Sequence, residues 1–180
     1  QERYLPGLIA GEHNLAIALT EPGSGSDAAA LRTTPTRVPG GWRLNGEKTA
    51  ISWATTAVAA VVYAREPGTT RSGGVSCLVV PLDAEGVTRR HMLGMGCLPL
   101  GWGSLHFDDV FVPDENLVGE EGRGFQVAMH HFDFSRAAIG LMCLGAAERS
   151  LEEAAVYATQ REAFGKPIAQ LQGVSFPIAE

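Results

Sequence analysis

Short apolar runs, separated by glycine and proline, make up the first two-thirds of the chain. Residues 15–19 form one run of strand length, and it stops at Thr20-Glu21-Pro22-Gly23, a strong turn signal. Residues 42–45 alternate between apolar and polar side chains, and Asn45-Gly46 predicts a hairpin turn into residues 48–52. Many short strands with Gly and Pro between them predict an antiparallel barrel or sandwich. The further candidate strands are residues 58–64, 75–80, 104–107 and 110–112.

The pattern changes near Glu120, where the chain becomes rich in residues that favour helix. Between Phe125 and Gln160 there is no proline, and Ala, Leu, Met, Glu and Arg dominate. Apolar residues fall on more than one face of this predicted helix. Because each apolar face must be buried, we expect the helix to belong to a bundle or to a subunit interface.

Residues 164–167 end this helix, and a second helix is predicted from near Ile168 to Ala179. The fold class expected is therefore α+β and multidomain: an antiparallel β-barrel or sandwich followed by long helices of an incomplete helical bundle. A start at Gln1 rather than Met, and a helix that stops at Glu180 without a C-cap, indicate a truncated chain.

Composition narrows the classes of function. The 180 residues carry a formal net charge of −6, and such mild acidity argues against nucleic acid as a partner, since phosphate binding needs a basic patch. No apolar stretch reaches the roughly 20 residues that span a bilayer, so no membrane partner is expected.

The five histidines offer no pair at a spacing suited to metal ligands, and no metal site is predicted. We expect the widely spaced Cys77, Cys97 and Cys143 to be buried free thiols in a reducing compartment.

The turn after the first apolar run is a candidate binding element. Glycine N–H groups in residues 20–27 can point at an anion, and Thr20 and Ser26 add hydroxyls. A solvated Gly/Ser turn is the competing interpretation, and the residues alone favour it. Ser52 ends a predicted strand, where its hydroxyl meets either a ligand or the backbone.

Two charged groups on the predicted helices have similarly open interpretations. Asp133 and Arg136 lie at i, i+3 among apolar neighbours, where an arginine needs an anionic or carbonyl partner; a solvated pair is the alternative. Arg161 and Lys166 bracket a helix end, where cations are favoured by the helix dipole without any ligand.

Four segments together resemble the acyl-CoA dehydrogenase family. Residues 19–27, Leu-Thr-Glu-Pro-Gly-Ser-Gly-Ser-Asp, resemble its flavin-binding signature, and Asn-Gly-Glu-Lys with Ile-Ser in 45–52 resembles its second flavin segment. Residues 132–136, Phe-Asp-Phe-Ser-Arg, resemble the helix motif beside the thioester pocket. Residues 161–172 resemble the signature near the FAD of the next subunit. The four occur in the family's order over the whole chain.

The resemblance implies three parts: residues 1–15 as the tail of a helical N-terminal domain, 16–120 as the middle β domain, and 121–180 as the start of the C-terminal helical domain. It implies FAD as cofactor, α,β-dehydrogenation of an acyl-CoA with hydride transfer to flavin N5, a homodimer or homotetramer, and electron-transferring flavoprotein as acceptor. The location implied is the bacterial cytoplasm or the mitochondrial matrix.

The resemblance also assigns roles to individual residues. Arg161 would reach the pyrophosphate of FAD in a neighbouring subunit, and Ser52 would lie near N5. The implied substrate contacts are Ser26, Asp133 and Arg136. The implied cofactor contacts are Leu19, Thr20, Gly25, Ser26, Ile51, Ser52, Arg161, Phe164 and Gln172.

Several positions depart from the family pattern. Ala50 stands where the family usually has Trp, and Glu66 stands where a small hydroxyl residue often approaches CoA. Residues 98–103 replace a polar stretch, which suggests a cyclic or branched acyl group. Ser135 stands where a minority of members carry the glutamate base, so the base is expected beyond Glu180.

Three functions follow from this comparison. The first is an FAD-dependent acyl-CoA dehydrogenase. The second is a flavin oxidase or monooxygenase of the same fold, or a dehydrogenase of thioesters on a carrier protein. The third is a non-catalytic remnant that binds a nucleotide or a partner.

Overall fold

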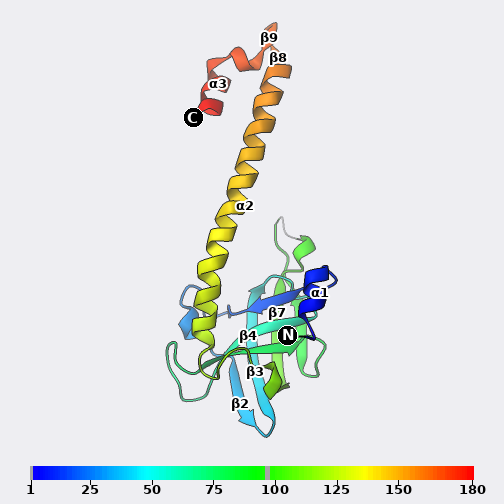
Figure 1. Cartoon of the computed structure of the whole chain (residues 1–180), viewed down its shortest axis with the longest axis vertical. Coiled ribbons are helices and arrows are strands. Elements are labelled where there is room, and N and C mark those ends of the chain that lie inside the picture. The colour runs from blue at the N-terminus through cyan, green and yellow to red at the C-terminus, as the bar shows by residue number, and fades with distance from the viewer. Residues whose placement is uncertain (1, 96–97) are drawn as a thin grey trace. The chain divides into compact units, whose positions relative to one another are not determined.

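The computed structural model describes residues 2–95 and 98–180 and divides into a first unit that ends at Met129 and a second unit, His130–Glu180. The first unit holds one short helix and two β-sheets (Figure 1). One sheet has the strand order β1-β4-β5 and the other has β2-β3-β7-β6. The elements of this unit are α1 (Leu5–Ala10), β1 (Leu15–Ala18), η1 (Ala28–Ala30), β2 (Thr34–Val38), β3 (Gly41–Ile51), β4 (Ala59–Arg65), β5 (Val75–Pro81), β6 (Val87–His91), η2 (Leu98–Leu100), β7 (Gly103–Pro113) and η3 (Asp114–Asn116), where η marks a 3-10 turn.

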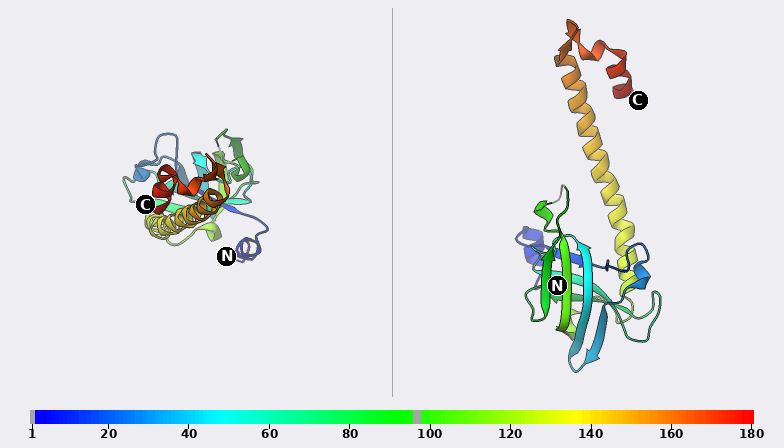
Figure 2. Two further views of the ribbon diagram at one scale, coloured as in Figure 1. Left: turned by 90° about the horizontal axis from the view of Figure 1, so that it is seen from above. Right: turned by 180° about the vertical axis from the view of Figure 1, so that it is seen from behind.

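The two sheets bury one apolar core between them. Side chains from both sheets belong to a single buried cluster, which makes this unit a sandwich (Figures 1 and 2). The expected fold class is confirmed, and no strand pairing closes the two sheets into a barrel within residues 2–95 and 98–129. The cluster includes Ala16, Ala18, Ala60, Val62, Leu78 and Val80 from one sheet, and Trp42, Leu44, Leu105, Phe107, Val110 and Val112 from the other.

One strand pair of the predominantly antiparallel sandwich is parallel, and it involves β1. This strand pairs in parallel with β4, with Leu15 opposite Ala59. Between the two, the chain passes through β2 and β3 of the other sheet and returns in the same direction, as parallel pairing requires a crossover connection.

The predicted hairpin at Asn45-Gly46 is wrong. β3 continues from Gly41 to Ile51, and both of its halves pair with β7, so these two residues lie at a register shift within the strand. Asn45 Oδ1 accepts a hydrogen bond from the Asp109 amide (2.8 Å). Gly46 has φ 141°, a conformation that favours glycine; a dipeptide typical of turns therefore serves a bulge here. Likewise, residues 104–107 and 110–112 belong to one strand, β7.

Two strands carry too weak an apolar pattern to be predicted. β2 contains Pro35, and β6 is mostly charged or polar. Both lie at the edges of the four-stranded sheet, where a proline or a charged side chain is tolerated because one side of the strand has no partner.

The second unit confirms the predicted long helix. α2 (Gly124–Gln160) begins in the first unit, and the elements after it are β8 (Glu162–Ala163), β9 (Lys166–Pro167), η4 (Ile168–Gln170) and α3 (Gln172–Ala179). The predicted second helix is therefore a 3-10 turn followed by an α-helix. Apolar side chains of α2 such as Phe134 and Leu141 are exposed, and their burial in a bundle or subunit interface stays a prediction.

Cys77 and Cys143 differ in their exposure to solvent. Cys77 is buried as expected, but Cys143 is exposed because it lies on a face of α2 that no described element covers. Cys97 lies outside the described residues.

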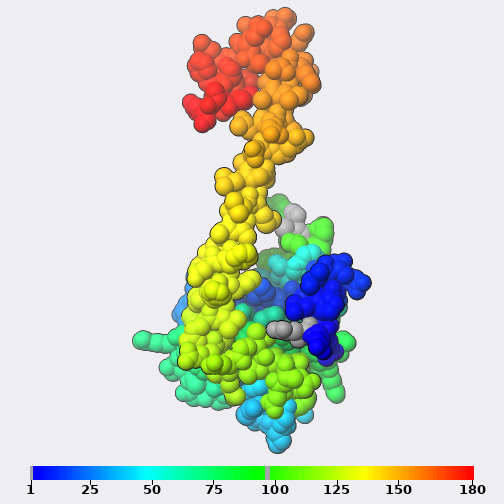
Figure 3. Space-filling model, viewed as in Figure 1, coloured from blue at the N-terminus to red at the C-terminus, as the bar shows by residue number. Residues whose placement is uncertain are grey.

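Leu5 and Ile9 of α1 (blue in Figure 3) are exposed at the surface of the first unit. Across residues 2–95 and 98–180 no helix is long and apolar enough to span a bilayer, and no His, Cys, Asp and Glu cluster suits a metal ion.

Candidate functional site

The turn after β1 is held by its own backbone and by one buried carboxylate. Glu21 and Ser24 exchange two backbone hydrogen bonds, of 2.9 and 3.1 Å. The Glu21 carboxylate turns inward and accepts hydrogen bonds from the amides of Arg32 (2.6 Å) and Thr33 (2.8 Å). A carboxylate that receives backbone N–H groups from a separate loop fixes both segments.

Lys48 of β3 completes this arrangement. Its Nζ lies 2.8 Å from Glu21 Oε1 and donates a second hydrogen bond to the Leu19 carbonyl oxygen (3.0 Å). The Lys48 side chain is 0% exposed and that of Glu21 is 6% exposed. Because a buried charge is costly without a partner, each of these two residues requires the other.

Burial and pairing shift both pKa values. Burial alone raises the pKa of the Glu21 carboxyl, but the Lys48 ammonium and the hydrogen bonds from Lys48 and Thr33 together lower it below its usual 4.5. Burial lowers the pKa of Lys48 to about 8, against the opposing attraction of Glu21. At neutral pH the two groups therefore form an ion pair.

The pair brings the first two predicted flavin segments together. Next to Lys48, the Thr49 amide donates a hydrogen bond to the Thr20 carbonyl oxygen (2.9 Å). The end of β1 is thus joined to the end of β3, which leads directly into Ile51 and Ser52. In this region Leu19 and Ile51 are buried, whereas Ser26 and Ser52 are exposed.

The end of β3 has a strained backbone. Ala50 and Trp53 have positive φ angles of 55° and 66°, which residues other than glycine seldom adopt. The Trp53 amide donates to the Leu100 carbonyl oxygen (2.8 Å), which helps to hold this bend in place. Such outliers gather at ligand sites, where the surrounding structure maintains them. Here they flank Ile51 and Ser52.

The turn itself leaves open space above its glycines. A Cβ added to Gly23 or to Gly25 would have no atom within 4 Å. The Ser24 hydroxyl is buried beside them and has no hydrogen-bond partner among the described residues. A ligand could therefore approach the backbone of this turn closely, because neither glycine carries a side chain.

The Glu66 side chain makes a structural hydrogen bond with Ser76. Its Oε1 accepts a hydrogen bond from the Ser76 hydroxyl (2.9 Å), and Ser76 Oγ accepts one from the Gly122 amide (2.9 Å). Ser76 is fully buried. The glutamate that departs from the family pattern therefore helps to fix the loop that precedes α2.

The remaining predicted site residues lie in the second unit and are exposed. Asp133 Oδ1 and Arg136 NH1 are 3.9 Å apart on α2, with side chains 80% and 71% exposed. Arg161 comes directly before the β8–β9 hairpin, and Ile168 comes directly after it. The Arg161 carbonyl oxygen accepts a hydrogen bond from the Ile168 amide (2.8 Å). Phe164 at the tip of this hairpin is 92% exposed, and Gln172 begins α3. The predicted roles of these residues stay predictions.

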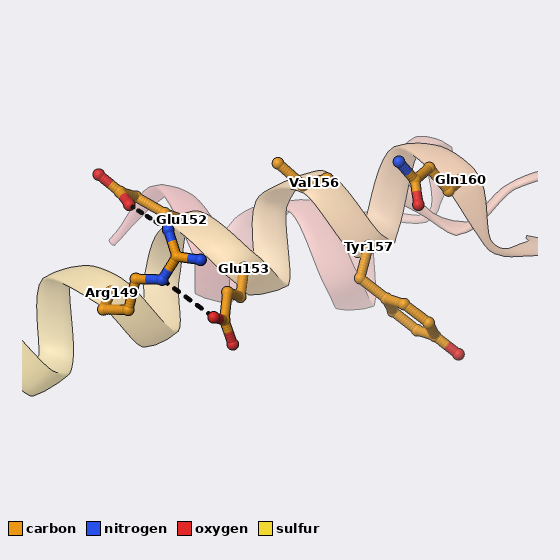
Figure 4. Close-up of a pocket in the computed structure, with 6 residues that line it drawn as sticks. All are labelled: Arg149, Glu152, Glu153, Val156, Tyr157 and Gln160. Carbon is orange, nitrogen blue, oxygen red and sulfur yellow. Dashed lines mark hydrogen bonds and ion pairs between the residues drawn. The ribbon is translucent and has the colours of Figure 1, made fainter.

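Two surface hollows fall elsewhere. One, of about 550 Å³, follows one face of α2, where Figure 4 shows Arg149 paired with Glu152 and Glu153 beside Val156, Tyr157 and Gln160. The other, of about 540 Å³, is lined by Arg43, Ala84, Glu85, Gly86, Asp108, Asp109 and Phe111. Neither includes a predicted site residue.

Reasoning from the sequence missed Glu21 and Lys48 as site residues. Both stand inside the segments quoted for the resemblance, yet no role was assigned to either. The sequence did contain a signal for an ion pair between them. Each charged residue interrupts or borders an apolar segment, and one is acidic while the other is basic. Local spacing could not show that the two meet, because β2 and most of β3 lie between them.

Two models of protein domains match most of the amino-acid sequence. Residues 16–110 match the model described as acyl-CoA dehydrogenase, middle domain, and residues 122–180 match the one described as acyl-CoA dehydrogenase, C-terminal domain. The chain belongs to the acyl-CoA dehydrogenase family.

Similar members of the acyl-CoA dehydrogenase family include proteins of several activities. The chain is 39% identical to the caffeyl-CoA reductase-Etf complex subunit CarC of Acetobacterium woodii, over 99% of this chain and 48% of that protein. It is similar to butyryl-CoA dehydrogenase from Megasphaera elsdenii (TM-score 0.92, 34% identity, 99% of this chain and 47% of that one). It is also similar to an acyl-CoA dehydrogenase complexed with FAD from Bacillus anthracis (TM-score 0.90, 37% identity, 99% and 31%). The chain spans about half the length of the curated relatives it matches.

Proposed function

We propose that this protein is an FAD-dependent acyl-CoA dehydrogenase. The observation that carries the proposal is the junction of the two flavin-like segments, in which Thr49 is hydrogen-bonded to Thr20 and Lys48 to Leu19 and Glu21. Bound FAD would supply the redox chemistry, taking up hydride from the substrate at flavin N5.

The residues of the two joined segments suit the binding of FAD. The exposed turn at Gly23 and Gly25 has room for a ligand to approach its backbone, and the unsatisfied Ser24 hydroxyl lies in the same turn. Thr20 and Ser52 stand at the two joined segment ends and offer hydroxyls as hydrogen-bonding groups. In the proposal, Leu19, Thr20, Gly25, Ser26, Ile51 and Ser52 hold FAD, and Arg161, Phe164 and Gln172 reach the FAD of a second subunit.

Further parts of the proposal concern the substrate and the partners. Ser26, Asp133 and Arg136 are the substrate contacts of this proposal. The exposed guanidinium of Arg136 suits a ligand rich in phosphate and carbonyl oxygens. The base is assigned to none of the carboxylates in residues 1–180. The active form is a homodimer or homotetramer, and the electron acceptor is electron-transferring flavoprotein, which the CarC name supports. The proposed location of the protein is a bacterial cytoplasm or a mitochondrial matrix.

The test is an anaerobic titration of the intact protein with acyl-CoA thioesters of straight, branched and cyclic chains. Bleaching of the flavin absorption by at least one thioester, with formation of the enoyl product and turnover with an artificial acceptor, is the expected result. A flavin that no thioester bleaches would contradict the proposal. In a separate assay in air, rapid oxygen consumption with a hydroxylated instead of a desaturated product would identify a monooxygenase of the same fold, and enoyl product formed together with hydrogen peroxide would identify an oxidase.

A second candidate within the fold acts on an acyl group that CoA does not carry. A structure of PigA with FAD and proline has the same fold (TM-score 0.91, 31% identity, 99% of this chain and 47% of that one). Glu66 favours this candidate, because a carboxylate replaces a small hydroxyl residue at the position expected to face CoA. A flavin bleached by an acylated carrier protein but by none of the free CoA thioesters would support it.

A further inference from the structure

The interior of the first unit contains one ion pair that is almost fully buried, Glu21–Lys48. The other ion pairs of the described residues have partners that are a third or more exposed, apart from the 32% exposed His106 paired with Glu47. Exposed ion pairs contribute little to stability, because water and salt screen their charges. The buried pair is therefore the one whose placement calls for a physical reason.

Stability gives a poor reason for this pair. Removing two charges from water is costly, and apolar residues of similar volume often stabilise a protein as well or better. The hydrogen bonds of the pair suggest another reason. Lys48 binds the Leu19 carbonyl oxygen, and Glu21 binds the amides of Arg32 and Thr33, so the contacts are directed at backbone atoms of particular residues.

These backbone contacts act at three segments at once. The pair connects the end of β1, the loop after η1 and the last third of β3. An apolar pair could fill the same volume, but it would fix neither the register of Thr20 against Thr49 nor the orientation of the glycine turn. Directional hydrogen bonds in a dry interior do both.

We infer that the Glu21–Lys48 pair is the positioning element of the flavin site: it holds Leu19, Thr20 and the glycine turn in their binding geometry before FAD arrives. The inference rests on the proposed function. Neither side chain is a contact residue, because at 6% and 0% exposure they lie beneath the turn, out of reach of a ligand on its surface. They act through the backbone that they orient, as supporting residues of a preformed site do.

The experiment compares FAD binding by the intact protein and a double variant, Glu21→Gln with Lys48→Met, which removes both charges and keeps similar volumes. Removing one charge alone would leave the other buried and unpaired, and unfolding would then hide any effect on the site. The control is Arg43→Met with Asp109→Asn, an exposed pair (NH1 to Oδ2, 3.4 Å) that also involves β3. A second control, Val110→Ala, weakens the buried core without touching the turn.

We expect the double variant to fold and to bind FAD about 10-fold or more weakly, since small displacements of a binding group have effects of this order. The visible circular dichroism of the remaining bound flavin should change, because a displaced backbone would then hold the ring. Both controls should keep the parent dissociation constant and spectrum, so a change in them would show that general destabilisation is the cause and would overturn the inference.

Two further outcomes distinguish a failure of this inference from a failure of the proposed function. A double variant with the parent dissociation constant and spectrum contradicts the inference while the proposed function stands; a parent protein that binds no FAD contradicts the proposed function itself. If the double variant does not fold, Glu21→Asp takes its place, since it keeps the charge but shortens the side chain by one methylene. Unchanged FAD affinity and spectrum in Glu21→Asp would then overturn the inference, and weaker binding with an altered spectrum would support it.

Discussion

The amide of Thr49 donates a hydrogen bond to the carbonyl oxygen of Thr20, across 2.9 Å. Thr20 ends the segment that leaves β1, and Thr49 lies in β3 just before the strained residue Ala50. This bond joins two segments that resemble flavin-binding signatures and lie far apart in the chain.

A side chain at Gly25 should block the ligand without harming the fold. Its Cβ would have no atom within 4 Å, and its φ is not in the positive range, so Gly25→Val should change the free energy of unfolding by less than about 0.5 kcal/mol. FAD affinity should fall by about 10-fold or more, since the valine occupies the ligand's space. Isothermal titration with FAD and urea unfolding measure the two effects. The control is Gly73→Ala, whose Cβ would contact the Thr70 carbonyl oxygen at an ordinary 3.4 Å; equal FAD affinity in both variants would contradict the prediction.

Arg136 should contribute to substrate binding and little to stability. Its pairing with Asp133 is long (3.9 Å) and exposed, so Arg136→Met should cost less than about 0.5 kcal/mol of unfolding free energy. We expect KM for the acyl-CoA to rise while kcat stays near the parent value. Arg149→Met is the matched control, because Arg149 is a similarly exposed arginine (70%) of the same helix. Steady-state kinetics that cannot distinguish the two variants would exclude the assigned role.

The backbone at Ala50 should be relieved by glycine. With φ 55°, alanine is strained here, so Ala50→Gly should raise the unfolding free energy by about 0.5–1 kcal/mol, whereas Ala50→Val should lower it by about 1–3 kcal/mol. Thermal melts of both variants check the signs. Ala60→Gly, in the buried strand β4, should destabilise and serves as the opposite case. A loss of stability in Ala50→Gly would show that the strain is absent.

The Glu21 carboxyl should make the fold sensitive to acid. Its folded-state pKa lies below the usual 4.5, so the unfolded chain takes up a proton first as pH falls. The stability that the ionised carboxylate contributes is therefore fully present above pH 4.5 and is lost as pH falls through the folded-state pKa. Urea unfolding below pH 4.5 should show a steeper loss in the parent than in the Glu21→Gln, Lys48→Met variant, which lacks the titrating group. Parallel pH profiles would argue against an ionised, paired Glu21.

Apolar patterning predicted much of the fold because strands with a buried face and a long helix leave strong local signals. The strands near 15–19, 58–64 and 75–80 and the helix from 125 to 160 agree with the structure to within a residue or two. The interpretation of Asn45-Gly46 failed because a dipeptide suited to positive φ serves a bulge as well as a turn, and the pairing of both halves of β3 with β7 is not a local property.

The site was predictable to a lesser extent. Comparison of motifs indicated Thr20 and Ser52, and the structure joins the segments that carry them. Glu21 and Lys48 were missed because their pairing depends on tertiary contact between the turn after β1 and strand β3, and no spacing rule within either segment shows it. Burial of the apolar faces of α2 in a bundle or subunit interface stays a prediction, because what covers these faces is not a property of the helix alone.

The central claim is that the two joined segments form one flavin site, and hydrogen exchange of the intact protein with and without FAD tests it most directly. Amide exchange should slow in both segments, residues 19–26 and 49–53, when FAD is added, while the β2–β3 connection at residues 38–41 stays unchanged. If FAD binds and leaves exchange in both segments as it was, or slows only one of them, the junction of Thr20 and Thr49 does not build the site.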